Sequence, residues 1–203
     1  MIARALSAGV PCKWVTGDEI YGNDRRLRVW LEEQELFHVL AVSSHQHVWV
    51  GFRQVRTGSL TKQIPQEAWS VVSAGDGAKG PRLYEWACLP LTSIMIEHQR
   101  WLLVRRNIER PEEMASYVVF APRKTTLGEM VRVAGRRWAI EESFQSAKGE
   151  VGLDHYEVRS WQGWYRHITL AMLAHAYLTV LRGRAAAEAK RAKKNEAAEA
   201  DEC

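Results

Sequence analysis

The sequence predicts an α/β fold interrupted by a long β-rich insertion, and three features of its 203 residues indicate this. Residues 13–42 have the pattern of a strand, a helix and a strand. Residues 43–121 consist of short apolar runs separated by glycine, proline and other turn residues, and helical periodicity returns from residue 125. Because 46% of the residues are hydrophobic and nine are tryptophan, a packed core is expected rather than disorder.

The first 42 residues carry the strand–helix–strand pattern. The apolar run at 13–16 predicts a buried strand that stops just before Asp18. Asp24 is a good N-cap for a helix over 25–35, in which leucine and tryptophan recur on one face. The apolar run at 37–42 predicts a second strand, so this segment is expected to be part of an α/β sheet.

The rest of the chain divides by composition. Residues 43–121 predict a mostly β insertion, because turn residues separate runs that are too short for helices. Residues 122–182 predict one long helix over 125–148 and a last helix over 161–181, which is apolar almost all round and therefore expected to be buried. The tail at 183–203 is low in complexity and predicts a frayed helix or disorder.

Charge and cysteine content narrow the class of protein. A formal charge of +4 and a pI of about 9.0 make nucleic acid a reasonable partner without requiring one. Cys12, Cys88 and Cys203 are too widely spaced for a zinc motif or a disulfide framework, so a cytoplasmic location is expected. The most apolar stretch, 169–181, is too short to span a bilayer and no signal peptide is recognisable, so no membrane partner is expected.

Arg137, Glu141 and Lys148 are the most informative residues of the helical part. At about 100° per residue, their spacing places them within about 40° of one another on a helix, at one edge of its apolar stripe. A carboxylate between two cations suits a site that holds a metal ion against a phosphate backbone. It equally suits a salt-bridged helix, so the spacing alone leaves both interpretations open.

Asp18 is the second candidate. It directly follows the predicted strand and precedes Tyr21 and Gly22, which places it at the carboxyl end of that strand. Ligands bind at that edge of open α/β sheets. The alternative is an aspartate that caps a helix or shapes a turn, and its position alone does not decide between the two.

A glycine pattern matches a known fingerprint only by its letters. Gly75, Gly77 and Gly80 have the spacing of a dinucleotide-binding loop. Pro81 and a strand-like run follow at once, whereas that loop must open a helix. A glycine-rich turn in the insertion is the better interpretation.

Two further groups of residues are ambiguous. His45 and His47 lack additional ligands with metal-site spacing, so surface or core histidines are expected. Four arginines near Trp101 suit either phosphate contacts or the solvated face of a strand. They are Arg100, Arg105, Arg106 and Arg110.

The spacing of Arg137, Glu141 and Lys148 resembles the signature of bacterial insertion-sequence transposases of the DDE type. That signature runs Tyr, two residues, Arg, three residues, Glu, six residues, Lys, and its tyrosine position holds Ala134 here. The resemblance covers most of residues 2–182. Its most similar stretches are W-V-T-G-D-E-I-Y-G at 14–22, S-A-G-D-G-A-K-G-P-R-L-Y-E-W-A at 73–87, W-A-I-E-E-S-F-Q-S-A-K at 138–148, and the segment 152–171.

The resemblance implies a partial RNase H-like fold with the β-rich insertion between the second catalytic Asp and the helix that bears the catalytic Glu. By motif, Asp18 corresponds to that second Asp and Glu141 to the Glu. Arg137 and Lys148 would grip transposon-end DNA. The first 42 residues and the helical part would then form the core on either side of the insertion.

The implied chemistry is cleavage and transfer of DNA strands during transposition, by an enzyme that can be oligomeric. In this family three carboxylates hold two Mg²⁺ ions, about 3.5–4 Å apart, which activate the attacking oxygen and stabilise the leaving one. Mg²⁺ prefers oxygen ligands, so Asp18 and Glu141 are the metal ligands that the resemblance assigns.

One departure from the family pattern concerns the first catalytic Asp. Residues 1–17 contain no Asp or Glu, whereas the family carries this Asp on an earlier strand. We therefore expect the chain to be the C-terminal part of a transposase that is inactive alone. The alternative is a non-catalytic remnant that binds DNA weakly through its phosphates.

Overall fold

The computed structural model describes residues 1–77, 80–157 and 159–201, with side chains as far as residue 192. The chain forms two compact units, Met1–Trp138 and the residues from Ala139 onward, which are described separately below. No helix within the described residues combines the length and the hydrophobicity that a membrane span requires.

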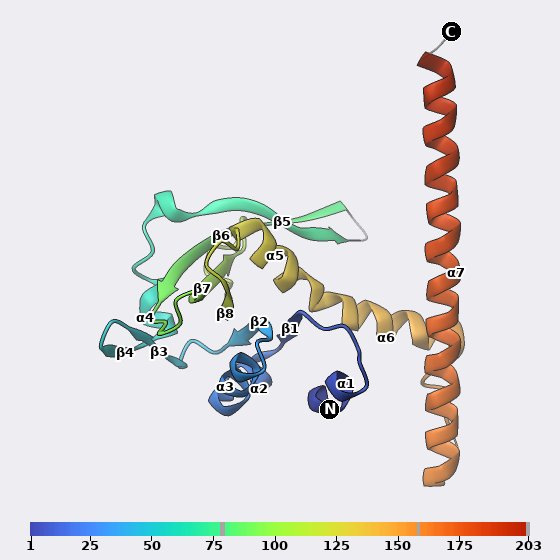
Figure 1. Ribbon diagram of the computed structural model, residues 1–203, viewed down its shortest axis with the longest axis horizontal. Helices are drawn as coiled ribbons and strands as arrows, with labels where there is room; N and C mark the ends of the chain where they lie inside the picture. The colour runs from blue at the N-terminus through green and yellow to red at the C-terminus, as the bar shows by residue number, and fades with distance from the viewer. Residues whose placement is uncertain (78–79, 158, 202–203) are drawn as a thin grey trace. The chain divides into compact units, whose positions relative to one another are not determined.

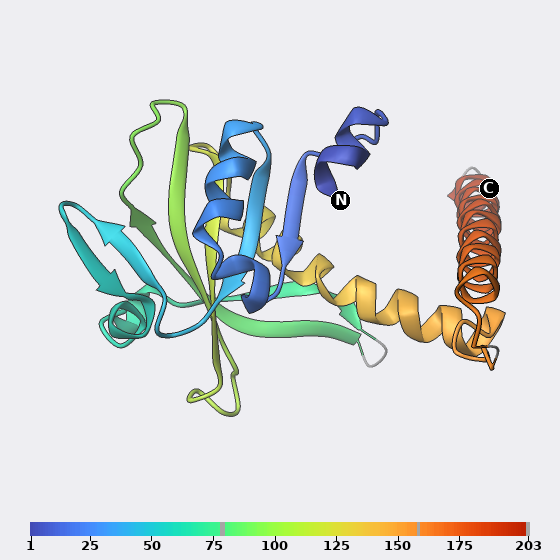
Figure 2. The same ribbon diagram turned by 90° about the horizontal axis from the view of Figure 1, so that it is seen from below.

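A curled six-stranded sheet is the centre of the first unit (Figure 1; Figure 2). Its first two strands are parallel, and all later neighbours are antiparallel. In sheet order the strands are β1 (Trp14–Gly17), β2 (Phe37–Val42), β8 (Met114–Pro122), β7 (His98–Arg106), β6 (Gly80–Leu91) and β5 (Ser70–Gly77). The predicted mixed α/β class is confirmed.

The two faces of this sheet are covered by different elements. Side chains alternate along β2, so Val39 joins the core beneath α5 (Leu127–Arg136). Leu40 joins the core on the opposite face, beneath α3 (Arg25–Glu33). The smaller elements of the unit are α1 (Ile2–Ser7), α2 (Glu19–Gly22), the hairpin of β3 (His47–Val50) and β4 (Arg53–Arg56), α4 (Thr57–Thr61) and the 3₁₀ turn η1 (Gln66–Ala68).

The predicted strand–helix–strand pattern at the N-terminus is confirmed. Asp24 caps α3 as expected, since its Oδ1 accepts a hydrogen bond from the backbone N–H of Arg26 at 2.8 Å. The short helix α2 lies between β1 and α3 and was not expected. It packs so closely on β2 that a Cβ at Gly22 would lie 1.7 Å from the carbonyl oxygen of Ala41.

The β-rich stretch at 43–121 is indeed mostly strands, and β5 to β8 continue the sheet that β1 and β2 begin. Within this stretch, short apolar or alternating runs at 47–52, 83–89, 101–105 and 117–120 predict strands, and these correspond to β3, β6, β7 and β8. The sequence did not indicate β4 and β5, whose exposed and half-buried residues lack a clear apolar run. Hydrogen bonding to a neighbouring strand, rather than local hydrophobicity, makes these two segments strands.

The single helix predicted over 125–148 is wrong, because the structure contains two helices there. α5 ends at Arg136, and α6 (Trp138–Val151) begins one residue beyond Arg137. Thr126 caps α5 by accepting a hydrogen bond from the N–H of Glu129 at 3.2 Å. Gly152, at φ +63°, follows the end of α6.

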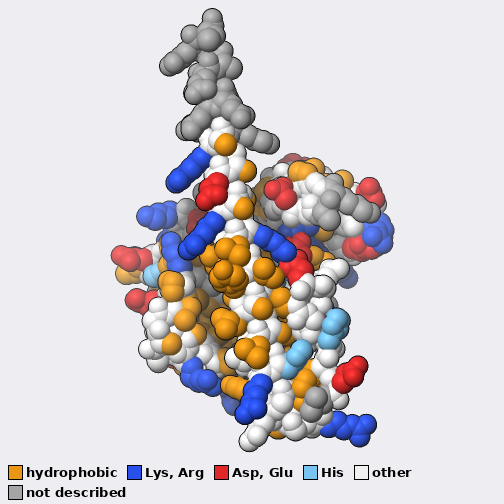
Figure 3. All heavy atoms as spheres, turned by 90° about the vertical axis from the view of Figure 1, so that its right-hand side faces the viewer, with side chains coloured by type: hydrophobic (Ala, Val, Ile, Leu, Met, Phe, Trp, Pro, Cys, Tyr) orange, Lys and Arg blue, Asp and Glu red, His pale blue; other side chains and the backbone are white. Residues whose placement is uncertain are grey.

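The expectation that the last helix is buried is also wrong. α7 runs from Trp161 to Asp201 and so includes most of the low-complexity tail. Of its described side chains, Ala171 is buried, while most of the large apolar ones are exposed. Hydrophobic side chains gather along α7 in Figure 3. The large apolar side chains of this helix that are exposed include Leu170, Leu173, Tyr177, Val180 and Leu181.

Candidate functional site

Asp18 lies where the sequence predicted, at the carboxyl end of β1 and exposed to solvent. It is also the N-cap of α2, because its Oδ1 accepts a hydrogen bond from the N–H of Ile20 at 3.1 Å. The capping interpretation is therefore correct. Capping uses one carboxylate oxygen, so it is compatible with a further ligand on the exposed side chain.

Arg137 occupies the junction between α5 and α6, at the end of the first unit. Its backbone is helical, with φ −56° and ψ −37°. Gly135 lets α5 approach β5 there, since a Cβ at this position would lie 1.8 Å from the carbonyl oxygen of Ala74. Arg82 of β6 links the same elements, because its guanidinium donates to the carbonyl oxygens of Ala74 and Gly135, each at 3.4 Å.

The approach of α5 to the sheet also fixes the surroundings of Tyr117. Burial raises the pKa of the Tyr117 hydroxyl, while the nearby charges of Arg105 and Arg137 oppose that shift. Sequence reasoning missed Arg82 and Gly135 as residues that position this junction. The only local signal was a glycine inside a helical pattern, which often indicates close packing.

Glu141 and Lys148 belong to the second unit, and both are exposed on α6. Seven residues along a helix return to the same face within about 20°, so the two side chains share a face of α6. Within this unit, Glu150 of α6 pairs with Arg182 of α7 at 2.7 Å. The hydrogen bond to Arg182 lowers the pKa of the Glu150 carboxyl.

The loop between α6 and α7 has its own hydrogen bonds. The N–H of Leu153 donates to the carbonyl oxygen of Ala147 at 3.2 Å, which caps the end of α6. His167 of α7 lies 3.1 Å from the carbonyl oxygen of Gly152 and packs against Tyr156. These contacts fix the start of α7 against the end of α6.

The boundary between the units therefore separates the four predicted site residues. Asp18 and Arg137 belong to the first unit, and Glu141 and Lys148 to the second.

Comparison with protein-family models gives a match to the transposase DDE domain over residues 4–177, which is most of the chain and includes all four predicted site residues. The chain belongs to the transposase DDE domain family. No curated protein matches it significantly.

Family membership gives the chain a role in DNA transposition, with DNA as the substrate of its family. Transposases of the DDE family typically use a divalent metal ion. Within the described residues, no group of three or more His, Cys, Asp or Glu side chains is arranged to hold a metal. Asp18 and Glu141 nevertheless fit Mg²⁺ in their chemistry, because both are solvent-exposed oxygen donors.

The glycine pattern of this transposase-family chain is a hairpin, as the sequence indicated. Gly77 of β5 pairs with Gly80 of β6, and Gly75 and Gly80 have φ values of +105° and +108°. Such values favour glycine. Residues 78 and 79 lie outside the described residues.

The four arginines at 100–110 do not form one cluster. Each makes a separate interaction with a different side chain, on either face of the sheet or in the loop after β7. Arg100 pairs with Glu32, Arg105 lies over the Tyr84 ring at 4.6 Å, Arg106 pairs with Glu85 at 2.7 Å, and Arg110 pairs with Glu113 at 2.5 Å. A single phosphate-binding patch of these arginines is therefore excluded.

Sequence reasoning also missed a polar group beneath α3. Arg28 and Glu32 are 8% and 6% exposed, although both side chains are ionisable. Arg100 of β7 makes two bonds to Glu32, with its Nε 2.9 Å from Oε1, and Arg28 donates to the carbonyl oxygen of Gly22. The spacing of Arg28 and Glu32 by four residues was visible, but their burial and the partner 68 residues away were not.

Proposed function

We propose that this chain takes part in Mg²⁺-dependent cleavage and transfer of DNA strands, with Asp18 and Glu141 as carboxylate ligands of the metal. The observation that carries the proposal is the family match over residues 4–177, which includes a carboxylate at the end of a strand and another on a later helix. The corresponding fold would be a partial RNase H-like core extended by the β-rich insertion.

Asp18 supports this role by its position. It follows β1, whose neighbour β2 is parallel to it, and the carboxyl ends of parallel strands are where α/β folds bind ligands. Its hydrogen bond to Ile20 uses one carboxylate oxygen and orients the exposed side chain, which has a second oxygen to offer to a metal.

Glu141 and Lys148 support it by sharing an exposed face of α6. In the proposed role, Glu141 offers a carboxylate and Lys148 a positive charge for a DNA phosphate. Arg137, held at the end of α5, would contact a second phosphate. When bound, Mg²⁺ would supply the positive charge that activates the attacking oxygen and stabilises the leaving oxygen.

These 203 residues alone are proposed to be inactive in strand cleavage. Asp18 and Glu141 supply two carboxylates, and the stretch before β1 adds no acidic residue to the sheet. Two carboxylates are fewer than the three that would hold a pair of metal ions in this family. Supercoiled DNA incubated with the chain and Mg²⁺ is expected to remain unnicked, and nicking that Glu141→Gln abolishes would contradict this.

The metal ligands can be tested by binding, without any activity. Mn²⁺ serves as a probe, and its affinity is measured by calorimetry or by its electron paramagnetic resonance signal. Asp18→Asn and Glu141→Gln are each expected to lower this affinity about tenfold or more. Asparagine is also a good N-cap, so Asp18→Asn keeps α2 intact.

Two matched variants control this test. Asp24→Asn removes an equivalent carboxylate charge at the N-cap of α3, and Glu142→Gln removes the one on the residue next to Glu141. Both are expected to leave Mn²⁺ affinity unchanged. Equal losses in controls and test variants would disprove the assignment of Asp18 and Glu141.

A second candidate function is a non-catalytic module that binds DNA only through phosphates. The net charge of +4 favours it, together with the presence of only two of the family's carboxylates at matching positions. It predicts binding that is indifferent to sequence and weakens steeply with salt. Unaltered Mn²⁺ affinity in the two carboxylate variants, together with salt-sensitive DNA binding, would favour this candidate over the first.

A further inference from the structure

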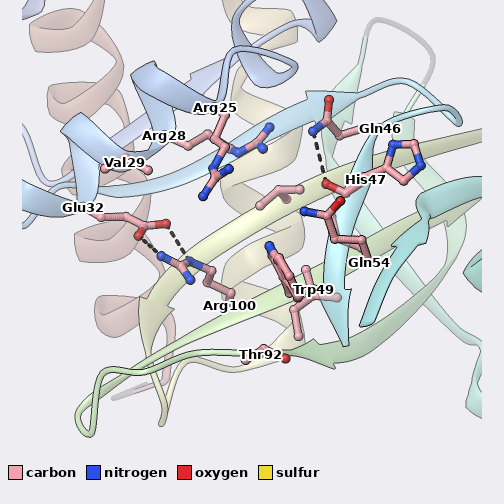
Figure 4. A pocket seen from close by; sticks show the side chains of 13 residues that line it. Arg25, Arg28, Val29, Glu32, Gln46, His47, Trp49, Gln54, Thr92 and Arg100 are labelled. Carbon is pink, nitrogen blue, oxygen red and sulfur yellow. Dashed lines mark hydrogen bonds and ion pairs between the residues drawn. The ribbon is translucent and has the colours of Figure 1, made fainter. Parts of the chain in front are cut away.

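A hollow of about 300 Å³ opens in the first unit between α3 and the β3–β4 hairpin (Figure 4). Arg25, Arg28 and Glu32 line it from α3, while Trp49 and Gln54 line it from the hairpin. Arg100, Leu91 and Val118 complete its sides on the sheet. None of the four proposed transposition residues lines this hollow.

The hollow carries an excess of positive charge. Three arginines face one carboxylate there, and that carboxylate, Glu32, is bonded to Arg100. Arg28 is 8% exposed and, within the described residues, makes no ion pair. Desolvation lowers the pKa of its guanidinium, and the charges of Arg100 and Arg25 act in the same direction. The carboxylates that oppose this shift are Glu32 and Asp24, the N-cap of α3.

The histidine beneath these arginines is uncharged, so it neither neutralises them nor adds to the positive charge of the hollow. His38 of β2 is fully buried, and burial and the charge of Arg28 lower the pKa of its ring to about 3. It is therefore neutral at pH 7. A buried, incompletely neutralised guanidinium costs free energy, which an anion bound beside Arg25 and Arg28 would offset.

The opposite wall of the hollow offers an aromatic ring and amides. Trp49 is 45% exposed and lies across the hairpin from Gln54, its partner in the β3–β4 ladder. The backbone around Trp49 is fixed, because its carbonyl oxygen accepts a hydrogen bond from the N–H of Thr92 at 2.9 Å and its neighbour Val48 is buried. In Figure 4, Arg25 and Arg28 extend into the space that Trp49 and Gln54 border.

We propose that this hollow binds one nucleotide unit of a single DNA strand, with its phosphate at Arg25 and Arg28 and its base against Trp49. Guanidinium groups bind phosphate through paired N–H donors. An aromatic face stacks on any base, and Gln54 can bond to a base edge. A volume of about 300 Å³ is within the range of sites for small ligands. Neither Asp18 nor Glu141 lines the hollow, so the proposed binding does not depend on strand cleavage.

Fluorescence anisotropy with a labelled oligothymidylate, in EDTA and at low salt, tests this site. Arg25→Gln is expected to weaken binding about fivefold or more, whereas Arg26→Gln is expected to have little effect. The two arginines are adjacent on α3 and both exposed, but only Arg25 lines the hollow. Arg25 is preferred to Arg28 for this test because Arg28 also holds the carbonyl oxygen of Gly22.

The Trp49→Ala variant tests whether the base stacks on the tryptophan ring. It is expected to weaken binding of oligothymidylate about tenfold and to leave binding of an abasic strand of equal length unchanged. Phe52→Ala is the matched control, because Phe52 is fully exposed in the same hairpin but does not line the hollow. Unchanged circular dichroism spectra verify that each variant is folded.

Several outcomes would overturn the proposal. One is an equal effect of Arg25→Gln and Arg26→Gln, and another is an equal loss for abasic and normal strands in Trp49→Ala. Competition by thymidine 5′-monophosphate as strong as that by the oligonucleotide would identify a free-nucleotide site instead of a strand site. Glu141→Gln is expected to bind the oligonucleotide normally, so failure of the proposed cleavage function is distinguishable from failure of this site.

Discussion

The two units of this chain use the same kinds of residues in opposite ways. In the first unit, large apolar side chains such as Leu31, Leu102 and Val119 are fully buried between helices and a sheet. In the second, Ala147 and Ala171 are the buried apolar residues among those described, while large apolar side chains of α7 are exposed. The first unit therefore has a core of its own, whereas the second is held by helix hydrogen bonds and a few polar contacts.

Single substitutions are therefore expected to affect stability differently in the two units. In a packed core, a change of one methyl group alters the free energy of unfolding, because neighbouring atoms have no space into which to move. On an exposed helix, the same change meets only water. Substitutions and pH changes in the first unit should therefore alter stability more than substitutions in the second.

The largest effect is expected from Gly135→Ala in the first unit. The added Cβ would lie 1.8 Å from the carbonyl oxygen of Ala74, so α5 must move away from β5. We expect the free energy of unfolding to fall by about 3 kcal/mol, measured by urea denaturation. Gly128→Ala, in the same helix with nothing within 4 Å, is the control and is expected to add about 0.5–1 kcal/mol. Equal behaviour of both variants would show that α5 does not pack closely on β5.

An intermediate effect is expected from acid, through His38. Its pKa is lowered to about 3 in the folded state by burial, against an ordinary value of 6.5. Below pH 6.5 the unfolded chain therefore binds a proton that the folded chain does not, so stability is lost as pH falls towards 3. Between pH 7 and pH 5 we expect this group alone to remove about 2 kcal/mol.

The measurement for His38 is the free energy of unfolding at several pH values, with His38→Leu as the comparison. The difference in pH dependence between the two proteins isolates this histidine from the other titrating groups. If the two profiles run parallel from pH 7 to pH 5, the His38 ring takes up its proton in the folded protein as well, which contradicts its burial as a neutral group.

The smallest effect is expected from Arg182→Gln in the second unit. This change removes the ion pair with Glu150. Both side chains are solvent-accessible, at 59% exposure for Arg182 and 32% for Glu150. Exposed ion pairs contribute little to stability because water screens them. The thermal midpoint, followed by circular dichroism, is expected to stay within experimental error, and a clear fall would mean that α6 and α7 depend on this contact.

Local patterns predicted much of the first unit. Alternating and apolar runs indicated β2 and β8, and Asp24 indicated the start of α3, because each signal lies within a few neighbouring residues. The same reasoning placed Asp18 at the end of a strand. It treated α5 and α6 as one helix because the helical pattern of the sequence continues through Arg137, whose backbone is itself helical in the structure.

The burial of α7 was predicted wrongly for a related reason. A helix that is apolar on most sides indicates burial only if other elements cover it, and that covering is not written in the helix itself. Leu173 and Tyr177 are 64% and 63% exposed despite lying in the most apolar stretch of the chain.

The α/β class, the start of α3 at Asp24 and the end of a strand before Asp18 follow from residue type and short spacings, and the same kind of pattern predicts roles for Arg137, Glu141 and Lys148. Three other properties become visible only in the folded chain: Glu32 bonds to Arg100 from 68 residues away, His38 is neutral beneath Arg28, and Trp49 borders the same hollow. The physical reason is that these properties come from burial and from contacts between strands and helices far apart in the chain, which no local periodicity encodes.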